Sequence, residues 1–561
     1  MFNKRNISIV AFLSLLIILT ISFGGWIAYK TDTQKPDYYF EINKNMSVFG
    51  KVYEEITNRY VEIIDPEKFM KAGIYGMLER LDPYTVFIEK EENDELQIIT
   101  HGKYGGVGMR ISKRGDYPTV VEPPFDGTPS AKAGIREGDQ IIEVDNEDTK
   151  GLSVSQTANR LRGKPGTDVF IKIRRIGEPN VLEFRLIREE IKVEEITFAD
   201  IVKDDIGYIR LAHFSRNVGE QMHDSIAELK QKGMKKLILD LRGNPGGLLE
   251  SAVSVADNFI SKGEKIVATK GKAMGTNKEY KAASDPIWGV EPLVVLVDTI
   301  SASASEIVAG AIQDLDRGII LGSPTFGKGL VQTVIPINNQ TALKITTAKY
   351  YIPSGRLIQK PDIYKDNKVL LSSNFSEDST KIFKTINGRT VKGSGGIVPD
   401  IRIEPKLMPL VIRHLIMKSM FFNFSLEYAA EHPNLSKEFE VGDEILNEFK
   451  AFLKNKDFSY KSPEERGLDD IKKIIDERGY SNETSESISK LEKIFDEQKN
   501  LDFNKNLDFI KLYLKSEIAG KLWGTSAKVR INLDKSDEVN RAIDLLTNET
   551  EYYKILNNKS N

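Results

Sequence analysis

The chain has 561 residues, of which 40% are hydrophobic and 29% are charged, and its formal net charge is −3. A chain of this length exceeds the usual size of one domain, so we expect several domains with cores of their own. The near-neutral charge gives no support for nucleic-acid binding, and the absence of cysteine excludes disulfides, thiol catalysis and cysteine metal sites. No histidine or carboxylate cluster has metal-ligand spacing, so we expect neither a metal nor another cofactor.

The N-terminus carries an apolar segment that predicts a membrane anchor. Lys4 and Arg5 precede an uncharged stretch at residues 6–29, which is long enough to cross a hydrocarbon core of ~30 Å. Basic residues ahead of the stretch favour a cytoplasmic N-terminus, with the rest of the chain outside, in the periplasm. A cleaved signal peptide is the alternative, but no clear Ala-x-Ala site follows. We therefore predict a single-pass membrane protein with a stub at residues 1–6 and a span at residues 7–29.

A helical region at residues 30–100 and a β-rich domain at residues 101–190 are expected next. The helical region has apolar residues at the spacing of an amphipathic helix. These residues are Phe49, Val52, Tyr53, Ile56 and Tyr60. The β-rich domain contains the runs YGGVGMRI at residues 104–111 and AGIREGDQII at residues 133–142, and together they resemble a PDZ domain. The resemblance implies that the domain captures a protein's C-terminus as an added strand.

The PDZ resemblance also implies which residues hold the peptide. The loop that would offer its backbone amides to the terminal carboxylate consists of Gly105, Gly106, Val107 and Gly108. The other wall of the groove would be a helix, and its apolar lining implies a preference for apolar tails. The lining residues of that helix are Val154, Ala158 and Leu161. Arg162, at the end of the helix, is expected to contact either the domain that follows in the chain or solvent.

A strand and a helix are expected on either side of the run SASASE at residues 301–306. Residues 292–297 form a short apolar block typical of a buried strand, and apolar residues from Ile307 onward recur at helical spacing. A serine at a strand-to-helix turn has helix N-terminal amides nearby, which suits a hydroxyl that attacks a carbonyl. Ser303 and Glu306 also satisfy the capping-box pattern, so a helix cap is the alternative role for Ser303.

A lysine follows in the run GKGLVQ at residues 327–332, which is expected to enter a strand. With a period of two residues, Lys328 and Gln332 share one face of that strand, so the glutamine could hold the lysine amine in position. An amine acts as a base only when it is neutral, which requires burial to lower its pKa from about 10.4. A solvated turn lysine is the alternative.

Two other assignments compete for these motifs. Residues 322–328 have the two glycines and the lysine of a phosphate-binding loop, but Gly329 stands where serine or threonine should bind magnesium. A strand pattern also follows where a helix should begin. The second alternative is a conventional triad of Ser303, His213 and Asp240. His213 alternates with apolar neighbours on an expected core strand, where a histidine with satisfied hydrogen bonds is the commoner finding.

Four motifs, taken in order, resemble those of the carboxyl-terminal processing peptidases, also called tail-specific proteases. The motifs are DLRGNPGG at residues 240–247, SASASE at 301–306, GKGLVQ at 327–332 and GIVPD at 396–400. The resemblance implies a mixed α/β body of the crotonase or Clp-protease type at residues 191–405, accompanied by a PDZ domain of the inserted type. It implies that Ser303 is the nucleophile, Lys328 the base and Gln332 the residue that orients the lysine. The implied oxyanion donors are the amides of Ala304 and of Gly246 or Gly247.

Residues 406–561 lie beyond the part that this resemblance covers, and their pattern predicts helices. Such a helical region is compatible with a homodimer contact, a wall of a substrate tunnel or the binding of a regulatory partner, and the sequence does not choose among these. The predicted function is that of a membrane-anchored extracytoplasmic serine endopeptidase, which captures apolar C-terminal tails of proteins or peptides and cleaves through an acyl-enzyme. A non-catalytic PDZ adaptor with a decayed protease body is the alternative.

Overall fold

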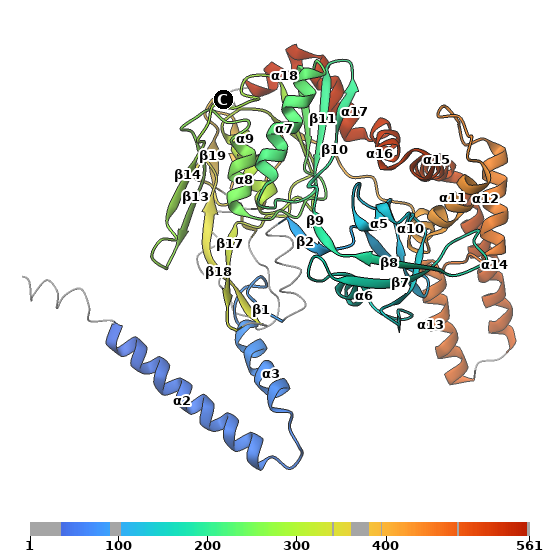
Figure 1. Ribbon diagram of the computed structural model, residues 1–561, viewed down its shortest axis with the longest axis horizontal. Helices are drawn as coiled ribbons and strands as arrows, with labels where there is room; N and C mark the ends of the chain where they lie inside the picture. Colours follow the sequence, from blue (N-terminus) through green and yellow to red (C-terminus); the bar gives the residue numbers. More distant parts are fainter. Residues whose placement is uncertain are drawn as a thin grey trace, which may run out of the picture. The chain divides into compact units, whose positions relative to one another are not determined.

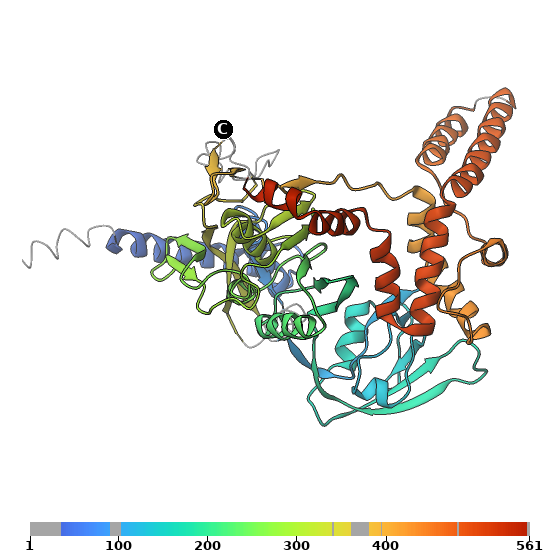
Figure 2. The ribbon, with the colours of Figure 1, turned by 90° about the horizontal axis from the view of Figure 1, so that it is seen from above.

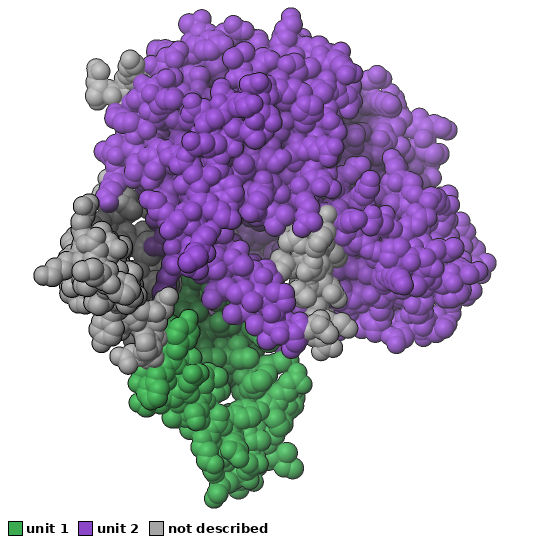
Figure 3. All heavy atoms as spheres, turned by 60° about the vertical axis from the view of Figure 1, so that its left-hand side comes forward, with its two compact units in different colours: residues 1–87 green, residues 88–561 purple. Residues whose placement is uncertain are grey.

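The computed structural model of the chain is drawn as a ribbon in Figure 1. It describes residues 35–89, 102–338, 341–360, 381–393, 395–479 and 482–557. The chain divides into two compact units, residues 1–87 and residues 88–561, which Figure 3 colours separately. All four motifs named above belong to the second unit.

The first unit is built from two described helices, α2 (Lys35–Arg59) and α3 (Pro66–Leu78). Asp65 defines the start of α3, because its side chain accepts hydrogen bonds from two backbone N–H groups of the first turn. The ring of Tyr53 on α2 stacks on the ring of Phe69 on α3, with centroids 5.8 Å apart. A helix is therefore present at the predicted place, with Phe49, Val52, Tyr53 and Ile56 in the second half of α2, whereas Tyr60 lies one residue past its end.

The prediction of a single-pass membrane protein with a periplasmic catalytic part is not supported and is corrected here. Among the residues that the structure describes, no helix is both long enough and apolar enough to cross a membrane. The longest, α2 and α14 (Asn482–Lys505), have 25 and 24 residues, and charged side chains recur along both. The segment at residues 7–29, on which the prediction was based, lies outside the described residues.

The β-rich domain of the second unit contains a six-stranded sheet in the order β3-β4-β5-β7-β8, with β6 paired to β5. The strands are β3 (Ile111–Arg114), β4 (Tyr117–Val120), β5 (Gln140–Val144), β6 (Glu147–Asp148), β7 (Asp168–Arg174) and β8 (Leu182–Ile187). Helices α5 (Pro129–Lys132) and α6 (Val154–Leu161) accompany the sheet. Ile141, Val169 and Ile171 lie in its buried core. A separate ribbon of β2 (Lys103–Gly106) and β9 (Glu189–Lys192) leads the chain into and out of this domain.

The body of the second unit is built on another six-stranded sheet, in the order β10-β11-β12-β15-β16-β21. The strands are β10 (Ile196–Lys203), β11 (Ile206–Leu211), β12 (Lys236–Asp240), β15 (Leu293–Val297), β16 (Ile319–Gly322) and β21 (Ile401–Arg402). β10 is antiparallel to β11, and the remaining pairs are parallel. The carboxyl ends of β12 and β15 therefore lie at the same edge of the sheet, where ligands bind in open α/β folds.

Alternate residues of these strands enter two different cores. On β15, Val295 packs with helices α7 (Val218–Gln231), α8 (Leu249–Ala256) and α9 (Ala304–Asp314). The next residue, Leu296, packs with the opposite core, which includes side chains of α17 (Asp537–Thr547) and α18 (Glu549–Leu556). Figures 1 and 2 show α17 and α18 beside the body, at the red end of the chain. Burial on both faces explains why residues 292–297 are continuously apolar.

A second sheet in the body is antiparallel, with β17, β18, β13 and β14 side by side. These strands are β17 (Leu330–Pro336), β18 (Ala342–Tyr351), β13 (Lys265–Gly271) and β14 (Lys278–Lys281). The remaining strands are β1 (Val86–Ile88) and the hairpin of β19 (Ile382–Lys384) with β20 (Thr390–Lys392). The lysine turn at residues 327–329 leads directly into β17.

The C-terminal region is helical, as expected. Besides α14, α17 and α18, its helices are α10 (Leu410–Met417), α11 (Met420–Glu431), α12 (Asp443–Asn455), α13 (Pro463–Arg478), α15 (Leu507–Trp523) and α16 (Thr525–Asp534). An aromatic core joins α11 to α12, since Phe449 lies 5.4 Å from Phe421 and 5.1 Å from Phe424 between ring centroids. The predicted fold class, a mixed α/β body with a β-rich PDZ-like domain and helical terminal regions, is confirmed. The domain limits given above stay predictions.

Candidate active site

Ser303 lies in the turn between β15 and α9, immediately before the helix begins at Ala304. Its backbone has φ 55° and ψ −111°, a left-handed conformation that non-glycine residues rarely adopt. Such strain persists only where surrounding contacts enforce it, and it is common for a nucleophile held at a sharp strand-to-helix turn. The helix itself is buried along its whole length, so the half-buried Ser303 is fixed at the end of a rigid element.

Glu306 joins the serine turn to the lysine turn. Its buried carboxylate accepts hydrogen bonds from the backbone N–H of Ser303 at 2.8 Å, of Gly327 at 2.7 Å and of Lys328 at 2.9 Å. A fourth bond comes from the Thr325 hydroxyl at 2.5 Å. Burial raises the pKa of Glu306 to about 7, although these four hydrogen bonds favour the charged form and oppose the rise. The predicted capping box therefore describes only part of what Glu306 does, because the same carboxylate also binds the turn that carries Lys328.

Tyr350, on β18, makes a second link between the two turns. Its hydroxyl oxygen lies 2.5 Å from the carbonyl oxygen of Lys328 and 3.1 Å from that of Ser303. The hydroxyl has one proton and can donate it to either carbonyl. Sequence reasoning missed Tyr350, because only the pairing of β17 with β18 brings it to the site.

Lys328 is half-buried and lies in the turn before β17, which begins at Leu330. Gln332 lies within β17, but the pairing with β18 has a register shift between Val331 and Gln332. The Gln332 side-chain nitrogen lies 3.4 Å from the Thr346 hydroxyl oxygen. The expected alternation along one continuous strand is thus interrupted, and the role of Gln332 in orienting the lysine stays a prediction.

The glycine turn after β12 lies directly against Ser303. A Cβ atom added to Gly246, whose φ is 100°, would lie 2.9 Å from Ser303 Cβ and 2.6 Å from Ala302 O. Asn244 holds the turn, since its Oδ1 accepts from Gly246 N at 2.9 Å and its carbonyl accepts from Ala302 N at 3.1 Å. Within the part of the chain that the structure describes, the N–H groups of Ala304 and Gly247 have no acceptor.

The alternative triad is not assembled in the structure. His213 is exposed and lies just past the end of β11, so it is not the core histidine that the pattern suggested. The Asp240 carboxylate is bound by Arg242 and by the Tyr208 hydroxyl, and no described hydrogen bond joins His213 to Ser303 or Asp240. The alternative of a phosphate-binding loop is also excluded, because strand β17 and not a helix follows the lysine turn.

The predicted peptide-binding loop has the tight backbone that a carboxylate cradle needs. Gly106, Val107 and Gly108 are buried, and Gly105 is half-buried. Gly108 has φ +80°, and a Cβ there would meet Thr128 at 2.3 Å. On α6, Val154 and Ala158 remain partly exposed whereas Leu161 is buried in the domain core, so only the first two are available to line a groove.

Arg162 contacts its own domain. Its guanidinium carbon lies 5.6 Å from the centroid of the Tyr104 ring, and its Nη1 lies 3.3 Å from Asn159 Oδ1. This places the arginine beside the start of the glycine loop. The expected contact between Arg162 and the body stays a prediction.

Several family models match successive parts of the chain. Residues 205–369 match peptidase family S41, residues 120–175 match a PDZ domain, and residues 411–546 match the probable PDZ-protease C-terminal helical domain. Residues 27–92 match the activating protease CtpB N-terminal domain. The C-terminal region, which the sequence motifs left outside the resemblance, therefore also matches a family of its own.

Individual relatives agree with these matches. The carboxy-terminal-processing protease of Bartonella bacilliformis is 38% identical over 327 residues, which are 58% of this chain and 74% of that protein. The carboxy-terminal processing protease CtpA of Bacillus subtilis is 32% identical over 373 residues, 66% of this chain and 78% of that protein. Among solved structures, a photosystem II D1 C-terminal processing protease is similar at 29% identity with a TM-score of 0.33, covering 64% of this chain and 88% of the other. The chain thus belongs to the carboxy-terminal processing proteases of peptidase family S41, and it is a serine peptidase with a PDZ domain that acts on proteins or peptides.

Proposed function

We propose that Ser303 is the nucleophile and Lys328 the general base of this peptidase. The observation that carries the proposal is the Glu306 carboxylate, which binds the backbone N–H of both residues and so holds their two turns together. Neutral Lys328 takes the proton of Ser303, and the serine oxygen attacks the carbonyl carbon of the scissile peptide bond. The lysine then gives the proton to the leaving amine, and water hydrolyses the acyl-enzyme. Gln332 keeps its predicted role of orienting the lysine amine.

We further propose that the oxyanion is held by the amides of Ala304 and Gly247. Support comes from the hydrogen bonds of the glycine turn: Gly246 N donates to Asn244, whereas Gly247 N has no acceptor among the described residues. The Ala304 amide stands at the first turn of α9, where the helix dipole adds to its attraction for an anion. Each such donor is worth about two to three orders of magnitude in rate.

The PDZ domain is proposed to capture apolar C-terminal tails. The buried loop at Gly106, Val107 and Gly108 supplies backbone amides for the terminal carboxylate, and Val154 and Ala158 supply the apolar wall. A peptide with an apolar last residue should bind, and the same peptide with an amidated C-terminus should bind at least about tenfold more weakly, because a charge-assisted hydrogen bond is lost. Fluorescence anisotropy of labelled peptides measures the difference, and equal affinities would reject the carboxylate cradle.

Cleavage of a tailed substrate by four variants tests the dyad. Ser303→Ala and Lys328→Ala should each lower kcat by about four to six orders of magnitude. Lys328→Arg keeps the positive charge but cannot become neutral, so it should be equally inactive. His213→Ala is the matched control and should retain activity. Full activity of Ser303→Ala would reject the nucleophile assignment, and an inactive His213→Ala would favour the triad. Tail binding without cleavage by the unmodified chain would favour the adaptor alternative.

A further inference from the structure

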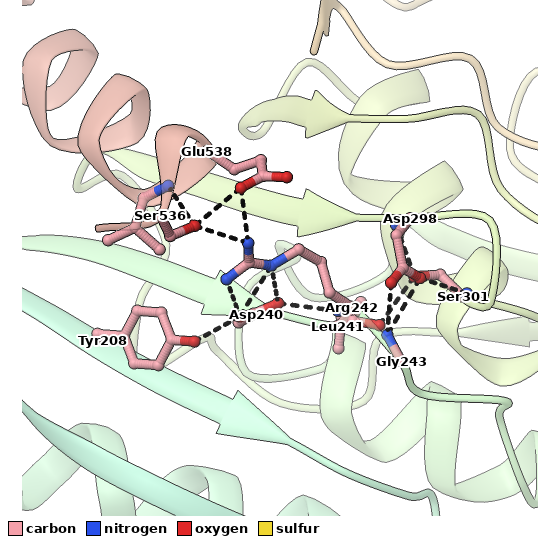
Figure 4. A network of polar contacts seen from close by, with 10 residues as sticks. Tyr208, Asp240, Leu241, Arg242, Gly243, Asp298, Ser301, Ser536 and Glu538 are labelled. Carbon is pink, nitrogen blue, oxygen red and sulfur yellow. Dashed lines mark hydrogen bonds and ion pairs between the residues drawn. The ribbon is translucent and has the colours of Figure 1, made fainter. Parts of the chain in front are cut away.

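Arg242 stands between two acidic side chains at the edge of the body sheet (Figure 4). On one side, its Nε lies 3.0 Å and 3.1 Å from the two carboxylate oxygens of Asp240, and its Nη2 lies 2.7 Å from one of them. The Tyr208 hydroxyl donates to the same carboxylate. Asp240 is the last residue of β12 and is buried, so this side of the guanidinium is fixed to the sheet.

The other side of the guanidinium is bound by the C-terminal region. Arg242 Nη1 donates to Ser536 Oγ at 2.9 Å and to Glu538 Oε2 at 3.0 Å. Ser536 caps α17 and donates its own proton to Glu538 at 2.8 Å. Both protons of Nη1 therefore have acceptors, and both acceptors come from the segment that begins α17.

The backbone on both sides of Arg242 is hydrogen-bonded to the loop before Ser303. Ser301 Oγ donates to the carbonyl of Leu241 at 2.8 Å, and Gly243 N donates to both oxygens of Asp298 at 3.0 Å. Asn244 then bonds Ala302, and Gly246 lies against Ser303. Arg242 and the glycine turn therefore belong to one short segment, so the contacts that hold the Arg242 side chain contribute to the position of the turn beside Ser303.

We propose that Glu538 and Ser536 are positioning residues for catalysis, which hold Arg242 and through it the glycine turn that receives the oxyanion. The proposal rests on the proposed function of that turn. It assigns the end of the C-terminal helical region a role in the chemical step, in addition to its packing against the sheet. Because the peptide-binding loop lies in another domain, the effect should fall on kcat and not on tail binding.

Attachment of α17 does not depend on this contact. Val539, Ala542 and Leu545 of the same helix are buried in the core on the far face of the sheet, and they remain when Glu538 is changed. Asp537 offers a matched control because it is also acidic and stands beside Glu538 in the first turn, yet it pairs with Lys406 and not with Arg242. Asp537→Asn thus removes the same charge from the same helix end and leaves the Arg242 contact intact.

The experiment compares full-chain Glu538→Ala, Glu538→Gln and Asp537→Asn with the unmodified protein. Glu538→Ala should lower kcat on a tailed substrate about tenfold, with KM changed less than twofold, since a hydrogen bond to a charged group is lost. Glu538→Gln retains an oxygen acceptor and should lose about threefold. Asp537→Asn should match the unmodified protein. A peptide boronic acid, which forms a tetrahedral adduct with an active serine, should bind Glu538→Ala about tenfold more weakly while tail-peptide affinity stays unchanged.

Each outcome decides the proposal. Unchanged kcat in Glu538→Ala, or an equal loss in Asp537→Asn, would overturn it. A loss of thermal stability alone, with an unchanged kcat per folded molecule, would also overturn it. If Glu538→Ala does not fold, Glu538→Gln is compared with Asp537→Asn instead. Failure of the underlying function is distinguishable, because Gly246→Ala, whose Cβ would meet Ser303, would then leave kcat unchanged whatever the Glu538 variants do.

Discussion

Glu306 is the single side chain on which the geometry of the site depends most. A carboxylate with two oxygens can accept four hydrogen bonds, and here the backbones of Ser303, Gly327 and Lys328 and the hydroxyl of Thr325 use all four. Burial of so fully bonded a carboxylate is tolerable because every lone pair has a donor. The same arrangement makes the group sensitive to its own protonation, since an added proton takes the place of one acceptor.

Changing Glu306 to glutamine should lower kcat about thirtyfold. The amide nitrogen of glutamine cannot accept the bonds that one carboxylate oxygen accepts now, and an unsatisfied buried donor costs ~2 kcal/mol. The pH dependence should change as well. In the unmodified protein kcat/KM should fall as pH drops through about 7, where Glu306 takes up its proton. Measured profiles should show this contribution of Glu306, and the glutamine variant should lose it while keeping the fall that protonation of the base Lys328 causes; identical profiles would contradict the assignment.

Glu306 should affect stability and activity in opposite directions as pH changes: a rise in pH should raise kcat/KM but lower the contribution of Glu306 to folding. The pKa of Glu306 in the folded chain is about 7, above the ordinary 4.5, so the folded state holds its proton more tightly than the unfolded state does. Its contribution to folding is therefore fully present below pH 4.5 and is lost as pH rises from 4.5 to about 7. Urea midpoints of the unmodified protein, compared with those of Glu306→Gln across this range, measure the contribution. Parallel curves would show that Glu306 is not the titrating group.

Local patterns predicted part of this site and could not predict the rest. The strand-to-helix turn at Ser303 and the turn at Lys328 follow from periodicity and glycine placement, and both are present. The capping box identified Glu306 but only as a helix feature, because a pattern within four residues contains no information on the distant Thr325 and Lys328. Tyr350 had no signal at all, since strand register decides which tyrosine reaches the turns.

At the scale of elements, the glycine turn after β12 is the most constrained. Gly246 and Gly243 both have positive φ, at 100° and 72°, so alanine strains the backbone at either position. Only at Gly246 would the new Cβ also collide with Ser303 and Ala302, while nothing lies within 4 Å of a Cβ at Gly243. Comparison of alanine variants at the two positions therefore distinguishes the effect of backbone strain from the effect of displacing Ser303.

Gly246→Ala should lower kcat at least about a hundredfold, because it moves an oxyanion donor or the serine itself. Gly243→Ala should lower stability by ~1 kcal/mol and kcat by less than about threefold. Steady-state kinetics and thermal unfolding of the two variants check this. Similar kcat values for both would mean that contact between the glycine turn and Ser303 does not matter for the reaction.

Hydrophobic patterns predicted secondary structure best where an element is buried on one face or on both. The apolar run at residues 292–297 predicted a buried strand, and β15 occupies residues Leu293–Val297 with both faces covered. For the C-terminal helices, apolar spacing predicted that one face of each helix is buried. It did not predict which part of the chain that face packs against. That α17 and α18 return to cover the sheet of the body depends on contacts between residues far apart in sequence, which helical periodicity does not encode.

At the scale of the second unit, the C-terminal helices also contact the PDZ domain. Lys521 of α15 forms an ion pair with Glu137, and the two side chains are only 5% and 12% exposed. The Lys521 ammonium also lies 3.9 Å from the centroid of the Phe422 ring on α11. Leu426 of α11 approaches Gly138 so closely that a Cβ there would lie 2.3 Å away. One helical region therefore touches both the PDZ domain and, through Ser536 and Glu538, the arginine beside the glycine turn.

Removal of Lys521 should loosen this contact between domains. Lys521→Met leaves Glu137 in a site where burial already raises its pKa, so the isolated carboxylate should cost ~3 kcal/mol of local stability. The double variant Glu137→Gln with Lys521→Met removes both charges and should recover at least about half of that loss. Lys515→Met is the control, because the partner of Lys515, Glu440, is 78% exposed and such a pair contributes at most about 0.5 kcal/mol. Hydrogen–deuterium exchange of α15 and β5 measures local stability; strictly additive losses in the double variant would mean that the two charges do not stabilise the contact as a pair.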